Sequence, residues 1–230
     1  MCLPRHPAVA YLRLVRPMRA RHVTAALLFC AAGRLLASGD QPDHLVPVRR
    51  ENGESGQYRR LIYKHLLVTP AQFGRMIYEP GFYEPEWAVS LYAVGQSHRI
   101  TVTKSRRSIW IALAGDKDER PRYNPIRTSR KDVLISAELA LAVQRAWATM
   151  LSRTRPEEDR FIFMDAPTVE FTLGSRRGEI TPPRKGLTIE MFEIGEALAK
   201  LCDIPTAQRP AEEKKLIRRL ASFEQKARKA

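Results

Sequence analysis

A chain of 230 residues with 44% hydrophobic and 28% charged residues can bury a core, and this composition excludes collagen-like, coiled-coil and disordered classes. Three cysteines are too few for a disulfide scaffold, and no apolar run reaches the roughly 18 residues of a membrane-spanning helix. What remains is an excess of basic residues, 39 Lys and Arg against 25 Asp and Glu, giving a net charge of +14.

The positive charge is concentrated at the two ends of the chain. Residues 1–39 contain six arginines and no acidic residue, and residues 206–230 contain eight basic and three acidic residues. The body between them, residues 40–205, carries only +3. A dedicated nucleic-acid binder usually concentrates basic residues on one face of its fold, so this body argues against that class.

Residues 1–39 have the order of a secretory signal. Arginines precede an apolar stretch, which small residues follow. Cleavage after Gly33 or Gly39 fits the small-residue rule, and a start at Met18 would leave a leader of more usual length. We therefore expect a periplasmic or secreted protein with no stable membrane span after processing. The alternatives are a retained membrane-surface helix and a soluble arm.

The folded part is expected to begin near Tyr58. Residues 40–57 are polar and rich in turn formers, which predicts a flexible linker ahead of a single domain over residues 58–205. Thr69-Pro70 is a typical helix start and predicts a short helix. The core-facing residues of this helix, at helical spacing, would be Phe73, Met76 and Ile77.

Three segments with β-strand character come next. They are residues 87–94, 99–104 and 108–114, and their connectors are short enough for hairpins. Short connectors predict an antiparallel meander, because parallel pairing needs a longer crossover. Residues 115–131 are charged and contain proline, and we expect a loop there.

Two amphipathic helices and a second group of strands complete the body. Ser136 is the expected N-cap of the first helix, and Thr188 that of the second. The first helix has an apolar stripe of Leu139, Val143, Ala146, Trp147, Met150 and Leu151, and the second has Met191, Ile194, Leu198, Leu201 and Cys202. Strands are predicted between the helices at 161–165, 168–173 and 178–181.

The order of these elements predicts an α+β fold. The antiparallel sheet would consist of two strand-strand-strand-helix units with both long helices on one face. The basic tail, residues 206–230, is expected to form a helix over residues 212–226 that folds against the body. A helix that docks on a partner is the alternative. Its narrow apolar stripe is Leu216, Ile217, Leu220 and Phe223.

Sequence motifs for common catalytic sites are absent. The chain has no glycine-rich phosphate loop, Cys-x-x-Cys, His-Glu-x-x-His or Gly-x-Ser-x-Gly motif. A metal site usually needs three protein ligands, and no such set is apparent, so no metal and no cofactor is predicted. The weak catalytic candidates are Glu84, Glu86, Asp165, Glu170, His65 and His98.

Two of these carboxylates stand out by their surroundings. Glu84 and Glu86 lie among aromatic residues, a combination that suits a glycan cleft. Glu170 and Glu179 could face each other across the second hairpin, where arginines would neutralise them.

The predicted binding residues are two arginine pairs, Arg106-Arg107 and Arg176-Arg177, each expected in a hairpin turn. On one edge of the sheet, the four arginines could grip a phosphate, an acidic protein surface or an anionic lipid.

The first functional hypothesis is an exported, non-enzymatic protein that binds an envelope protein or anionic polymer through these hairpin tips and the basic tail. The first alternative is an envelope glycan or phosphoester hydrolase that uses the acidic residues and a histidine. The second, less favoured, is a cytoplasmic nucleic-acid binder that retains its N-terminal segment.

Overall fold

The computed structural model describes residues 43–49, 52–67, 72–81, 84–114, 125–156, 166–183 and 186–230. The predicted leader and the predicted strand 161–165, with Asp165, lie outside these residues.

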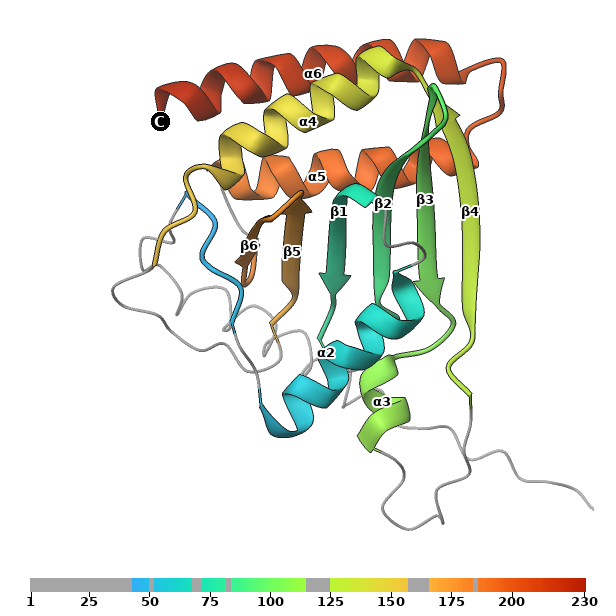
Figure 1. The fold of residues 1–230 in the computed structure, drawn as a ribbon, viewed down its shortest axis with the longest axis vertical. Coiled ribbons are helices and arrows are strands. Elements are labelled where there is room, and N and C mark those ends of the chain that lie inside the picture. The colour runs from blue at the N-terminus through green and yellow to red at the C-terminus, as the bar shows by residue number, and fades with distance from the viewer. Residues whose placement is uncertain are drawn as a thin grey trace, which may run out of the picture. The chain divides into compact units, whose positions relative to one another are not determined.

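A six-stranded antiparallel sheet forms the centre of the fold, in the order β4-β3-β2-β1-β5-β6 (Figure 1). Its strands are β1 (Gln72–Glu79), β2 (Trp87–Val94), β3 (Ser97–Ser105), β4 (Thr128–Ile135), β5 (Thr168–Leu173) and β6 (Arg176–Ile180). The predicted α+β class is confirmed. The predicted three-strand units are not observed, because four strands, β1 to β4, precede the helix over residues 137–151.

One face of the sheet carries the main core. The helices α4 (Ala137–Leu151) and α5 (Gly186–Lys200) pack on this face, and α6 (Arg209–Lys229) packs on both of them as a third layer (Figure 1). A short 3-10 turn, η1 (Leu201–Asp203), follows α5. The tail is therefore helical and packs on the body. Its buried residues are Leu216, Leu220, Phe223 and Ala227.

The opposite face carries a smaller second core. It is covered by α2 (Gly53–Leu66) and α3 (Ile109–Ala114), which lie in front of the sheet in Figure 1. Their apolar contacts with β1 and β2 consist of Ile62, Leu66, Ile77, Ala88 and Ile109.

The helix α4 forms as its sequence predicts. The Ser136 side chain accepts a hydrogen bond from the Leu139 N–H, at 3.2 Å. Every residue of the predicted apolar stripe is buried in the main core. The apolar stripe and the Ser136 cap indicate the same helix, so the local sequence is sufficient to predict α4.

The predicted helix after Thr69 is wrong, because residues 72–79 form the strand β1 between β2 and β5. Met76 packs in the main core, whereas Ile77 packs in the second core. A strand buried on both faces does not alternate between apolar and polar residues, so its pattern resembled that of a helix.

The predicted third strand, residues 108–114, is also wrong. Residues Ile109–Ala114 form α3, and β4 pairs with β3 in its place. The first half of β4, residues 128–131, belongs to the segment predicted to be a loop. The cause is distant in sequence: the Glu86 carboxylate accepts hydrogen bonds from Ile109 N, at 2.8 Å, and Trp110 N, at 3.3 Å. This carboxylate caps the helix.

The predicted linker is wrong for residues 43–49, which we call the strap. The Asp43 carboxylate accepts hydrogen bonds from Leu187 N and Thr188 N and caps α5, the role expected of the Thr188 side chain. Leu45 is buried in the main core, and Val46 forms a backbone bridge to Glu179 of β6. The predicted start of the domain is also too late, because α2 begins at Gly53.

Candidate functional site

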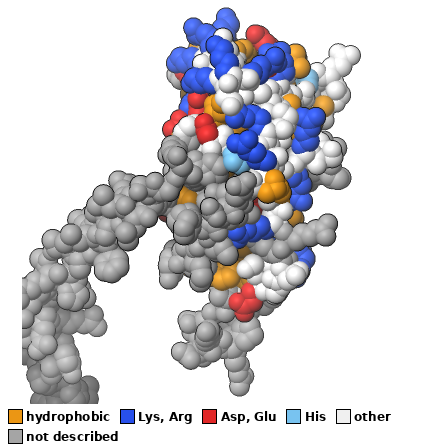
Figure 2. Space-filling model, turned by 90° about the vertical axis from the view of Figure 1, so that its left-hand side faces the viewer, with side chains coloured by type: hydrophobic (Ala, Val, Ile, Leu, Met, Phe, Trp, Pro, Cys, Tyr) orange, Lys and Arg blue, Asp and Glu red, His pale blue; other side chains and the backbone are white. Residues whose placement is uncertain are grey.

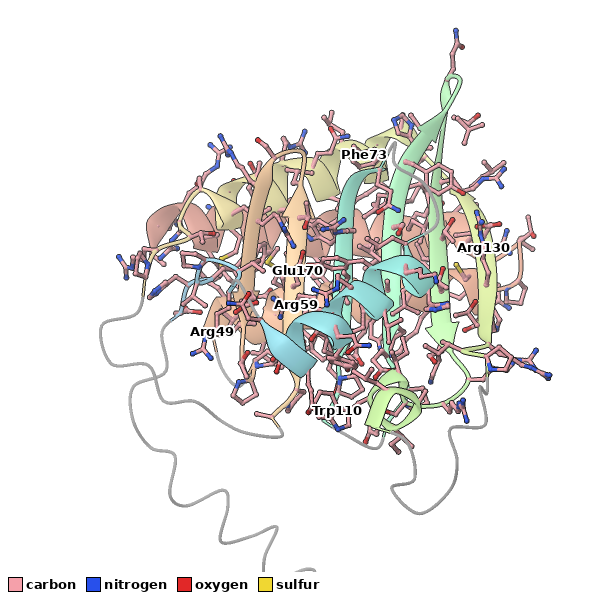
Figure 3. The ribbon with its side chains drawn as sticks, turned by 60° about the horizontal axis from the view of Figure 1, so that its bottom comes forward. Arg49, Arg59, Phe73, Trp110, Arg130 and Glu170 are labelled. Carbon is pink, nitrogen blue, oxygen red and sulfur yellow. The ribbon has the colours of Figure 1, made fainter. Side chains whose placement is uncertain are left out.

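Charged side chains join α2 to the sheet (Figure 3). The strand registers place Ile77 of β1 opposite Glu170 of β5, and Glu170 opposite Glu179 of β6, so both glutamates share the face on which Ile77 contacts α2. We call this group the charged seam. Its members are Arg59, Tyr63, Arg75, Glu79, Glu170, Arg177 and Glu179.

Glu170 is the centre of the charged seam and is fully buried, with 0% of its side chain exposed. Its Oε1 accepts from Arg75 at 3.2 Å and from Arg177 at 2.9 Å, and its Oε2 accepts from the Tyr63 hydroxyl at 2.5 Å. Both guanidinium groups also lie near the Tyr63 ring, at 5.2 and 5.6 Å from its centroid, within cation–π range.

A second set of ion pairs extends the seam toward β6. Arg59 of α2 lies 3.6 Å from the Glu79 carboxylate and 3.3 Å from that of Glu179. Glu179 Oε1 also accepts from the Arg49 N–H, at 3.3 Å, which ties the strap to the seam. The possible facing of Glu170 and Glu179 is confirmed, and Arg177 and Arg59 provide the neutralising charges.

The surroundings of Glu170 favour its ionised form. Burial would raise the pKa of Glu170, but the Tyr63 hydrogen bond and the charges of Arg177 and Arg75 outweigh it and lower the pKa. Burial, with the neighbouring Glu170 charge, raises the pKa of Tyr63. Glu170 is thus a fixed anion and Tyr63 a fixed donor. The seam fastens α2 to the sheet.

The other carboxylate candidates lie apart from Glu170. Glu86 is buried, accepts from the Tyr58 hydroxyl at 2.8 Å and caps α3, so its oxygens are already used. Glu84 lies on the surface. Within the described ranges, no hydrogen bond or ion pair joins Glu84, Glu86 and Glu170 to one another.

The two histidine candidates are equally separate from the carboxylates. His65 is half-buried near the end of α2, where burial and the Lys64 charge lower its pKa. His98 lies in β3, opposite Ala93, and its ring is edge-on to that of Phe73 with centroids 6.1 Å apart. Among the residues with described positions, no group of three His, Cys, Asp or Glu side chains could hold a metal ion.

The two arginine pairs do not converge. Arg106 and Arg107 follow β3 beyond Lys104, whose partner is Trp87 at the start of β2. Arg176 and Arg177 begin β6 and pair with the last residues of β5. Because β5 and β3 are linked through the registers of β1 and β2, the two pairs lie at opposite ends of the sheet. Neither pair occupies a hairpin turn.

Arg176 and Arg177 belong instead to a basic surface along the β6 side of the molecule. The Arg155 N–H donates to the carbonyl of Leu45 in the strap, and Arg153 donates to the carbonyl of Ala227 in α6. Figure 2 shows Lys and Arg side chains gathered over this side. We call this the β6-edge surface and define it by Arg49, Arg153, Arg155, Arg176 and Arg177.

Of the five arginines of this surface, Arg177 is paired with a nearby carboxylate, that of Glu170. Glu170 and Glu179 are buried, and Asp43 caps α5. Burial, together with the charges of Arg155 and Arg153, lowers the pKa of the neighbouring His44. Sequence reasoning missed Arg153 and Arg155 because only the strap, read as a linker, brings them beside β6.

Comparisons with known proteins give no relative: no family model matches, and neither the curated proteins nor the solved structures contain a match. Within the described part of the chain, no helix has the length and apolar character that crossing a membrane requires.

Proposed function

We propose that the protein is exported and binds a phosphate-bearing anionic polymer of the cell envelope through the β6-edge surface. The observation that carries the proposal is the meeting of arginines from the strap, the end of α4 and β6 on one side of the fold. Export is supported by the order of residues 1–39 in the sequence.

A polymer is favoured over a folded protein by the lack of apolar anchors on this side. Protein interfaces usually centre on buried aromatic or aliphatic side chains. Of the described residues, the exposed large hydrophobic ones are Val94, Ile111, Leu134 and Leu141, and none belongs to the β6-edge surface. Arginine matches phosphate through paired hydrogen bonds, and such binding needs no apolar core.

The test uses the full chain and linear polyphosphate. The triple variant R49Q/R155Q/R176Q is expected to bind polyphosphate more weakly and to reduce the slope of log affinity against log salt by roughly two to three. The matched control, K104Q/R106Q/R127Q, removes the same charge at the far end of the sheet, where Arg106 N donates to the Arg127 carbonyl. It should bind nearly as the unmodified chain does.

Three results would count against the proposal. Equal losses in both triple variants would mean that only net charge matters. Tighter binding of duplex DNA than of polyphosphate would favour the nucleic-acid alternative. Recovery of the native protein at full length in the cytosol, shown by its intact mass after fractionation, would refute the proposed export and with it the envelope ligand.

A further inference from the structure

A second group of polar residues lies on the α2 face of the sheet and shares Arg75 with the charged seam. The registers align Gln72, Tyr92 and Arg99 across β1, β2 and β3, and align Arg75 with Ser90 in the next row. Side chains in register on neighbouring strands point to the same face. Arg75 reaches Glu170 beneath α2, so this is the face that α2 partly covers.

The hydrogen bonding of this group is incomplete. Polar atoms of four side chains are enclosed and have no hydrogen-bond partner among the described residues: the Gln72 amide, Arg75 Nε, the Ser90 hydroxyl and Arg99 Nε. Ser90 is only 1% exposed. Because about nine in ten buried polar groups in proteins are paired, four unpaired ones on adjacent strands call for an explanation.

The group also has more positive than negative charge. Arg75 shares the Glu170 carboxylate with Arg177. Arg99 lies 4.0 Å from Asp132, whereas Arg130 is closer, at 3.2 Å. Four arginines therefore share these two carboxylates. Arg59, which pairs with Glu79 and Glu179 on the same face, reduces the excess to one positive charge.

We propose that Gln72, Arg75, Ser90 and Arg99 bind a phosphate group, free or as a monoester. The donors outnumber the lone pairs of a carboxylate, whereas a phosphate can accept from all of them, and the excess positive charge favours an anion. We call this group the Ser90 site. Arg75 and Arg99 are 19% and 34% exposed, so rotation of two arginine side chains would admit the anion above Ser90.

The first experiment measures inorganic phosphate binding to the full chain by calorimetry and by thermal unfolding, at constant ionic strength set with chloride. Glycerol phosphate replaces phosphate in a parallel arm, and acetate in another. We expect either phosphate compound to bind and raise the melting temperature, and the tighter one identifies a free or an esterified ligand. Equal shifts with acetate, or no shift beyond chloride, would overturn the phosphate site.

Variants distinguish the Ser90 site from general charge. R99Q should weaken phosphate binding by about 10- to 100-fold, as expected for loss of hydrogen bonds to a charged group. R106Q, which removes the same charge at the far end of the sheet, should bind phosphate unchanged. An equal loss in R106Q would overturn the proposal.

S90A provides a readout that does not depend on the arginines. It should weaken phosphate binding while raising the melting temperature of the ligand-free protein, because it removes an enclosed hydroxyl without a partner. A lower melting temperature would show that the hydroxyl is satisfied without ligand, and would refute the site. Failure here leaves the polymer proposal intact, since R49Q/R155Q/R176Q tests other residues.

Discussion

Replacing Glu170 by Gln is the sharpest test of what holds α2 on the sheet. The substitution keeps the size of the side chain but removes the charge that two arginines and Tyr63 share. Removing one partner of a buried ion pair typically costs about 3–5 kcal/mol, because the other charge stays buried and unpaired.

The partial exposure of the two arginines sets the size of the effect. The Arg177 side chain is 40% exposed and can turn to water, whereas Arg75 is 19% exposed and loses its carboxylate. We therefore expect E170Q to lower the free energy of unfolding by about 3 kcal/mol, the lower end of the range. For a domain of this size, that corresponds to a fall in melting temperature of roughly 6–12 °C.

The stability lost in E170Q should depend on pH. The folded pKa of Glu170 lies below its unfolded value of about 4.3, so its contribution is complete above that pH and is lost as the pH falls through the folded pKa. The unfolding free energies of E170Q and the unmodified chain, measured with denaturant, should thus converge as the pH falls through the folded pKa of Glu170. The exposed Glu84 provides the matched control, E84Q. A loss below about 1 kcal/mol at pH 7, or one that persists unchanged in acid, would refute the reasoning.

Three further substitutions or treatments test other contacts. D43A removes the cap of α5 and should lower the free energy of unfolding, measured with denaturant, by about 1–2 kcal/mol. An unchanged free energy would mean that the strap does not cap α5 in solution. F223A removes a fully buried side chain of α6 and should cost about 3–5 kcal/mol; a negligible change would mean that α6 does not pack on the body in solution. Burial raises the pKa of the half-buried Cys202 to about 11, so its thiol should react slowly with a disulfide reagent below that pH. Rapid labelling of Cys202 itself at pH 8, located by peptide mass because the chain has three cysteines, would contradict this.

The elements that sequence predicted well are those whose signal is local. The hairpin of β2 and β3 has short strands and a tight turn, and α4 has both an apolar stripe and Ser136 at its start. Because each signal lies within a few residues, no knowledge of the tertiary fold was needed.

The elements that were missed depend on distant partners. Ile109, Ile111 and Leu113 alternate as a strand would, yet Ile111 is exposed and Glu86 starts a helix there. The strand β4 is charged because it lies at the sheet's margin and only one side of it pairs.

The candidate sites divide in the same way. The pairing of Glu170 with Glu179 was accessible from the hairpin alone, and so was Arg177 as a counterion. The contact of Arg75 with Glu170 could not be predicted, because the sequence pattern of residues 72–79 favours a helix. Only as part of the strand β1 does Arg75 lie beside Glu170 and Ser90. The basic surface depended on the strap, whose contacts with α5 and β6 are separated by more than a hundred residues.

The strap has a consequence for self-association. Leu45 and Val46 lie against the middle of β6, and a Cβ on Gly178 would come within 2.8 Å of Leu45. In the described part of the chain, β4 is therefore the margin at which another copy could add a strand. If two molecules paired their β4 strands about a twofold axis, neither would keep a free β4 edge. Strand addition would therefore end at a dimer and could not continue into a fibre.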